Sequence, residues 1–155
     1  MASNQLNNLP PARAITVIRI IWGALLLGQF AFAAVVAIIL TQQGRQPAPA
    51  VDPTILLMIN IAMLVVIVPA MFMMRMKTFG RNRVNGLITP AAYSTGNIMF
   101  WAGCESVSFF GLVVAMLTHN FWPTILCVIA AMAVQIVTFP RLSDIQAPAE
   151  TFKIM

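Results

Sequence analysis

The stretch WAGCESVSFFGLVVAM, residues 101–116, contains Glu105, the only acidic residue of the chain that lies inside a long apolar run. Of the 155 residues, 60% are hydrophobic and 8% are charged, whereas soluble domains carry about 25% charged residues. This composition predicts a membrane protein, and the length predicts a single domain, residues 1–155. A carboxylate inside so apolar a chain is the first candidate for a functional group.

Four apolar runs are long enough to cross a hydrocarbon core of about 30 Å, which needs roughly 20 helical residues. None alternates polar and apolar residues as the strands of a membrane barrel do, so each run is predicted to be a helix. The predicted helices cover residues 15–40, 54–74, 97–117 and 122–139, and Pro90 allows the third to begin near residue 90. The sequence therefore predicts an all-α fold, an antiparallel bundle of four transmembrane helices.

The basic residues indicate how these helices are oriented. With a cytoplasmic N-terminus, eight basic residues lie at the inner side, and one, Arg45, lies outside. The eight are Arg13, Arg19, Arg75, Lys77, Arg81, Arg83, Arg141 and Lys153. This bias predicts that both termini are cytoplasmic, in a bacterial-type inner membrane. Because the basic residues sit at helix ends, they are topology signals, and no nucleic-acid partner is expected.

The predicted inner loop, residues 75–90, is the most basic part of the chain, and Gly80 and Gly86 are expected to break any helix within it. Its positive charge predicts contact with anionic lipid head groups at the inner face. The residues predicted to make this contact are Arg75, Lys77, Arg81 and Arg83. At the outer face, Trp122 is predicted to anchor the fourth helix at the lipid interface.

A small-x-x-x-small pair, Ala24 and Gly28, lies on one face of the first helix and predicts the close approach of another helix. Gln29 lies beside this pair and has two interpretations. It is either a packing residue that hydrogen-bonds a neighbouring helix or a ligand within the membrane.

Glu105 is predicted to lie near the membrane midplane, because it follows Asn97 by eight residues, about 12 Å along a helix. No basic residue is predicted at its depth, so desolvation favours the protonated acid. Ser106 is adjacent, Ser108 lies at i+3, and Gln29 is predicted at a similar depth on the first helix. Carboxylate, hydroxyl and amide oxygens suit a hard cation such as Na⁺, or hydrogen-bond a protonated acid.

Residues 102–115, AGCESVSFFGLVVA, carry small residues, a carboxylate followed by serine, an aromatic pair and Gly-Leu-Val. This pattern resembles the ion-carrying helix of the c subunits of rotary ATP synthases and ATPases, the proteolipids. The resemblance covers about one helix of the four predicted. It implies that Glu105 is the ion carrier, with Ser106 and Gln29 as supporting ligands, and that Glu105 reacts with carbodiimides.

An enzyme is not expected, because the chain has one histidine and no nucleophile or phosphate-binding motif. No catalytic residue, metal ligand or cofactor other than H⁺ or Na⁺ is predicted. The first hypothesis is a protein that binds and passes H⁺ or Na⁺ through Glu105, as a homo-oligomer or with other membrane subunits. The second is an accessory or structural subunit of a larger membrane complex, in which a protonated Glu105 hydrogen-bonds another helix.

Overall fold

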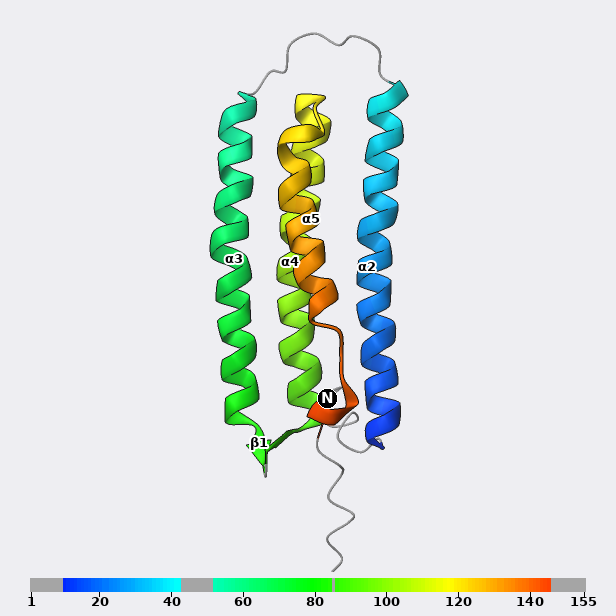
Figure 1. Cartoon of the computed structure of the whole chain (residues 1–155), viewed down its shortest axis with the longest axis vertical. Coiled ribbons are helices and arrows are strands. Elements are labelled where there is room, and N and C mark those ends of the chain that lie inside the picture. Colours follow the sequence, from blue (N-terminus) through cyan, green and yellow to red (C-terminus); the bar gives the residue numbers. More distant parts are fainter. Residues whose placement is uncertain (1–9, 43–51, 85, 146–155) are drawn as a thin grey trace, which may run out of the picture.

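The computed structural model describes residues 10–42, 52–84 and 86–145. These residues form an α-helical bundle with one short antiparallel hairpin (Figure 1). The helices are α2 (Pro11–Gln42), α3 (Pro53–Arg81), α4 (Pro90–Thr118) and α5 (Trp122–Val137), followed by the 3₁₀ helix η1 (Leu142–Asp144). The strands are β1 (Arg83–Val84) and β2 (Leu87–Ile88), which join α3 to α4. The predicted all-α class is thus confirmed.

Helices α2, α3 and α4 have 32, 29 and 29 residues and are apolar enough to cross a membrane. The fourth predicted span corresponds to α5, which has 16 residues and is therefore about 24 Å long, shorter than a hydrocarbon core of about 30 Å. Among the described residues, three helices are thus long enough to span. Their composition is that of a membrane protein.

The helix starts follow simple local chemistry, since α3, α4 and α5 each have proline in the first turn. Proline lacks a backbone N–H, and in the first turn of a helix an N–H would have no intrahelical acceptor. At the start of α3, the Asp52 side chain also accepts a hydrogen bond from the Thr54 N–H at 2.8 Å. Helix α4 begins at Pro90, as the sequence allowed.

The end of α3 differs from the sequence prediction. The expected loop at residues 75–90 is helical as far as Arg81, and Gly80 does not interrupt it. A single glycine costs a helix only about 1 kcal/mol, and arginine, lysine and methionine favour the helical state. Gly86 does prevent helical structure, because it has a φ of 83° in the turn between β1 and β2.

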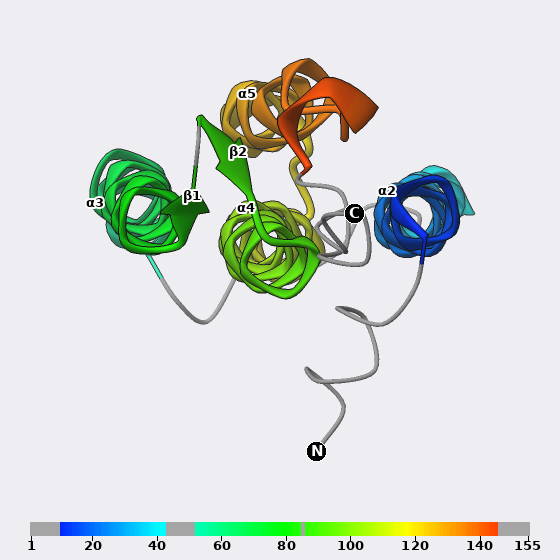
Figure 2. The same ribbon diagram turned by 90° about the horizontal axis from the view of Figure 1, so that it is seen from below.

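Helix α4 is the centre of the bundle. It packs against α2, α3 and α5, whereas α2 and α3 lie on opposite sides of the α4–α5 pair (Figure 2). In the apolar part of α4, 56% of residues are buried, compared with 11% in α2 and 6% in α3. The outer helices therefore present most of their apolar side chains to the surroundings.

Glycines on α4 allow this close packing. A Cβ at Gly111 would lie 2.9 Å from Val128 Cγ2 on α5 and 3.2 Å from Asn60 Oδ1 on α3. The predicted approach at Ala24 and Gly28 is not made within this chain, because a Cβ at Gly28 would have no atom of the described residues within 4 Å. The small residues that matter for internal packing are those of α4.

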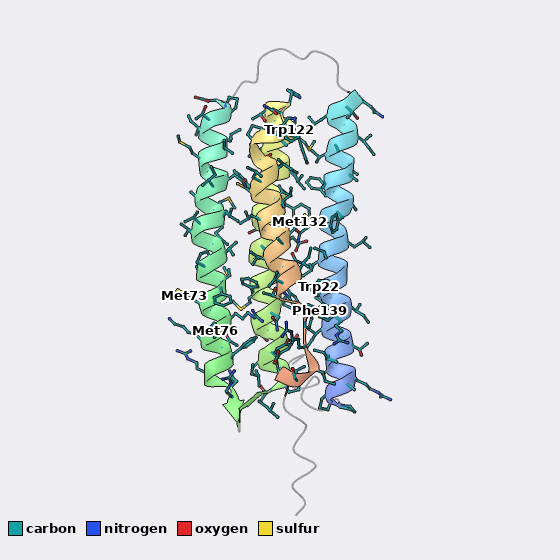
Figure 3. The ribbon with its side chains drawn as sticks, in the orientation of Figure 1. Trp22, Met73, Met76, Trp122, Met132 and Phe139 are labelled. Atoms are coloured by element: carbon teal, nitrogen blue, oxygen red, sulfur yellow. The ribbon has the colours of Figure 1, made fainter. Side chains whose placement is uncertain are left out.

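Below α5, the chain continues in extended form beside α2 (Figure 1). The Arg19 Nε–H donates a hydrogen bond to the Pro140 carbonyl oxygen at 3.3 Å, and its guanidinium lies 5.0 Å from the Phe139 ring centroid. Trp22 packs edge-on against Phe139 (Figure 3), with ring centroids 5.0 Å apart. Arg19 thus supplies a hydrogen-bond donor to a backbone carbonyl that has left the α5 helix.

Candidate functional site

Glu105 lies near the middle of α4 and is half-buried. No described residue forms a hydrogen bond or an ion pair with its carboxylate. An intramembrane carboxylate without such partners is costly in its charged form. Within the described part of the chain, therefore, no group compensates a negative charge on Glu105.

One side of α4 is not covered by any described helix (Figure 2). Its exposed residues recur at helical spacing and form a stripe of Thr95, Ala102, Ser106, Val113 and Leu117, which we call the open stripe. Glu105 borders this stripe on the flank that faces α2. Phe109, one turn after Glu105 on the same face, contacts Phe32 of α2 with ring centroids 5.1 Å apart.

The contact between Phe32 and Phe109 also sets the relative height of the two helices, which run in the same direction (Figure 1). Gln29 precedes Phe32 by three residues and Glu105 precedes Phe109 by four, so their heights differ by only about 1.5 Å. The similar depth predicted for these two residues agrees with this register. No hydrogen bond joins them in the described structure.

Gln29 is instead paired with Gln135 of α5, because its Nε2 donates to Gln135 Oε1. Both side chains are fully buried. The pair leaves Gln29 Oε1 and Gln135 Nε2 buried without hydrogen-bond partners among the described residues. Of the two interpretations of Gln29, the structure shows the interhelical hydrogen bond, and a ligand role stays a prediction.

Ser108 is the third polar side chain at this depth, fully buried with its Oγ unpartnered within the described structure. Trp101 donates a hydrogen bond to Thr138 at 3.2 Å, and Gly111 faces Val128, which together set the register of antiparallel α4 and α5. By this register, Ser108 and Gln135 lie within about one turn, roughly 5 Å, of the height of Glu105. Gln29, Gln135 and Ser108 are called the midplane polar layer below, where the midplane is the middle of the length of α4.

Ser106 does not join this layer. Its side chain is exposed on the open stripe, and its Oγ donates a hydrogen bond to the Gly103 carbonyl oxygen of its own helix at 2.8 Å. Of the predicted ligands, Gln29 and Ser108 are thus buried at the height of Glu105, and Ser106 lies on the uncovered side. The predicted ligand oxygens that lie at this height are those of the Glu105 carboxylate, Gln29 Oε1 and Ser108 Oγ.

Two buried amides were not predicted as site residues. Gln135 belongs to the layer, although in the sequence it lies only about one turn inside the predicted end of the fourth helix at residue 139. Asn60 of α3 donates from Nδ2 to the Val107 carbonyl oxygen at 3.2 Å and leaves its Oδ1 without a hydrogen bond among the described residues. In the sequence, both could have been recognised as site candidates because each is an amide inside an apolar helix.

The predicted lipid-interface residues lie at the two ends of the bundle. Lys77, Arg81 and Arg83 are exposed at the lower end, where Arg75 is half-buried. Trp122 is exposed near the opposite end (Figure 3). Within the described ranges, no three His, Cys, Asp or Glu side chains are grouped so that they could hold a metal ion.

No family model, curated protein or solved structure matches the chain.

Proposed function

We propose that the protein is a non-enzymatic membrane protein that binds H⁺ or Na⁺ at Glu105 and passes it along the uncovered side of α4. The observation that carries this proposal is a half-buried carboxylate, near the middle of the central apolar helix, without a hydrogen bond or counter-charge from the described residues. A bound proton or sodium ion neutralises such a group. A half-buried carboxylate at the edge of the open stripe can exchange its ion without unfolding the bundle.

The midplane polar layer supports the same role. Gln29 Oε1 and Ser108 Oγ are buried acceptors without partners among the described residues, and unsatisfied buried groups are rare in native structures. They can accept a hydrogen bond or contribute oxygen ligands when the Glu105 site is loaded. The resemblance of residues 102–115 to a proteolipid ion-carrying helix points to the same chemistry.

The membrane arrangement that goes with this function has four helices crossing a bacterial-type inner membrane with both termini cytoplasmic. The extended chain after Val137 completes the fourth crossing, because Arg19 and Trp101 satisfy polar groups below α5. The open stripe and Glu105 face a second copy of the chain or another membrane subunit. A partner there shields the carboxylate from lipid, which lowers the cost of its charged form.

The second candidate function is an accessory or structural subunit of a larger membrane complex. It is favoured by Gly28, which has free space around it and forms a small-residue pair with Ala24. Such a face allows another subunit to approach the α2 backbone closely. In this role, Glu105 is permanently protonated and donates a hydrogen bond across the subunit interface.

Carbodiimide labelling separates these functions. An apolar carbodiimide adds to a protonated carboxyl, so we expect the full-length protein in membranes to be labelled at Glu105. Raising the pH removes the proton and should lower the labelling, and Na⁺ at constant pH should protect Glu105 if Na⁺ is the ion. Peptide mass mapping locates the adduct.

Asp52→Asn, which removes an exposed carboxylate at the start of α3, is the matched control and should leave the labelling unchanged. Glu105→Gln should abolish it. Labelling that responds to neither pH nor Na⁺ would favour the accessory subunit. Absence of labelling at every pH, with Glu105→Gln behaving as wild type, would exclude the ion-binding proposal.

A further inference from the structure

A pocket of about 250 Å³ lies at the lower end of the bundle, away from Glu105. Three segments distant in sequence build it: the last turns of α3, the β1–β2 hairpin, and η1 near the end of the described chain. A parallel bridge between Ile88 and Ile145 ties the hairpin to the residue after η1. The pocket is therefore part of the folded structure.

The cationic wall of the pocket consists of Arg75 and Arg83. The Arg75 guanidinium carbon lies 5.0 Å from the ring centroid of Phe79 and 5.6 Å from that of Phe100, so two rings hold it in place. Its Nε is shielded from solvent and has no hydrogen-bond partner among the described residues. No described carboxylate forms an ion pair with either arginine. Oriented guanidinium donors left unused in this way suit a phosphate group.

Ser143 and Asp144 also line the pocket. Tyr93, which stacks on Phe79 with ring centroids 5.4 Å apart, positions this part of the lining. Its hydroxyl donates to Asp144 Oδ2 at 3.4 Å and accepts from the Arg141 N–H at 2.9 Å. Ser143 Oγ also donates to Asp144 Oδ1 at 3.4 Å. Both bonds to this carboxylate are long, which leaves it with acceptor capacity for a donor group on a ligand. A simple anion has no hydrogen-bond donor to offer to the Asp144 carboxylate.

The remaining wall is apolar and includes Phe72 and Met76 of α3, both exposed. They lie among the exposed apolar side chains of the lower half of α3, where Figure 3 shows Met73 and Met76. Arg75 precedes the end of α3 at Arg81 by six residues, about 9 Å, which corresponds to the membrane interface of a helix this long. A ligand in the pocket can thus place a polar head inside and an acyl chain along α3.

We propose that this pocket binds the head group of a glycerophospholipid. The phosphate lies between Arg75 and Arg83, and a hydrogen-bond donor beyond the phosphate, a glycerol hydroxyl or an ethanolamine ammonium, reaches Asp144. This goes beyond attraction of anionic lipid to a basic surface, because Asp144 makes the site selective for head groups with donors. The site is independent of ion binding at Glu105.

Native mass spectrometry of the full-length protein, titrated with phosphatidylglycerol, phosphatidylethanolamine or phosphatidylcholine of matched chains, measures binding. The first two should bind about tenfold more tightly than phosphatidylcholine, whose head group has no donor. Arg75→Gln and Arg83→Gln should each lower the affinity for phosphatidylglycerol about tenfold, the effect of one lost charge-assisted hydrogen bond. Asp144→Ala should remove the discrimination between phosphatidylethanolamine and phosphatidylcholine, which have the same net charge and differ in head-group donors.

Lys77→Gln is the matched control, since it removes the same charge from an exposed residue outside the pocket. It should change the affinity by less than about twofold. Equal losses from Lys77→Gln and Arg83→Gln would overturn the proposal in favour of unspecific attraction to surface charge. Arg83 is exposed on β1, so its variant provides this comparison even if Arg75→Gln does not fold.

Soluble glycerol phosphate separates the lipid from a free phosphate ester. It should fail to displace phosphatidylglycerol at millimolar concentration, because the acyl chain contributes through the apolar wall. If glycerol phosphate displaced phosphatidylglycerol at micromolar concentration and occupied the pocket itself, the pocket would be assigned to a soluble phosphate ester. That result would overturn the lipid assignment.

Discussion

Replacing Gly111 by leucine is expected to lower the free energy of unfolding by about 3 kcal/mol, at the upper end of the usual cost of overpacking a core. The new side chain would begin with a Cβ 2.9 Å from Val128 Cγ2 and 3.2 Å from Asn60 Oδ1. It therefore presses on α3 and α5 at once, and α4 cannot move away from one without colliding with the other. Reversible unfolding in mixed detergent, followed by tryptophan fluorescence and circular dichroism, measures the change.

Gly28→Leu is the matched control on α2. A Cβ there meets no described atom within 4 Å, and leucine favours a helix over glycine by about 1 kcal/mol. This variant should be neutral or slightly stabilising in the monomer. Equal destabilisation by the two substitutions would contradict the central position of α4. A loss of oligomer by Gly28→Leu without loss of monomer stability would instead locate a subunit contact on α2.

Replacing Gln29 by methionine, which has a similar shape, is expected to lower the free energy of unfolding by about 1–3 kcal/mol. The substitution removes the only hydrogen bond that the described structure gives to the Gln135 side chain and leaves that amide buried. Gln135→Met should have a comparable effect for the reciprocal reason. The same unfolding measurement applies to both variants.

The double variant Gln29→Met with Gln135→Met should be more stable than the sum of the single effects predicts, because it removes both polar groups together. A double-mutant cycle gives the coupling energy directly. Strict additivity of the two substitutions would mean that the amides do not depend on each other, contrary to the pairing described above.

The elements of the fold follow from local features of the sequence, whereas their contacts do not. Hydropathy and proline positions predict the helices and place Glu105 inside one of them, because burial in lipid acts on each segment separately. Which helix lies in the centre depends on Gly111 meeting Val128 and Asn60 together. Ala24 and Gly28 carry the same local signal, yet they face away from the neighbouring helices.

The candidate site was predictable in part for a similar reason. Glu105, Gln29 and Ser108 are visible as polar residues in apolar helices, and depth follows from counting residues. Gln135 lies about one turn before the predicted end of the fourth helix, and its pairing with Gln29 depends on how α5 packs against α2, which counting residues does not give. The pocket at the lower end of the bundle brings Asp144 and Arg75 together, and no periodicity relates segments so far apart in sequence.

The separation of α2 from α3 by the α4–α5 pair has a consequence for how the protein is made. Ribosomes deliver α2 and α3 before α4 and α5, and α2 and α3 lie on opposite sides of the finished bundle (Figure 2). A nascent chain that ends after the β1–β2 hairpin therefore holds two inserted helices without a native surface to share. Assembly must wait for α4 to leave the translocation machinery and insert between them, so early proteolysis or capture by membrane chaperones competes with folding at that stage.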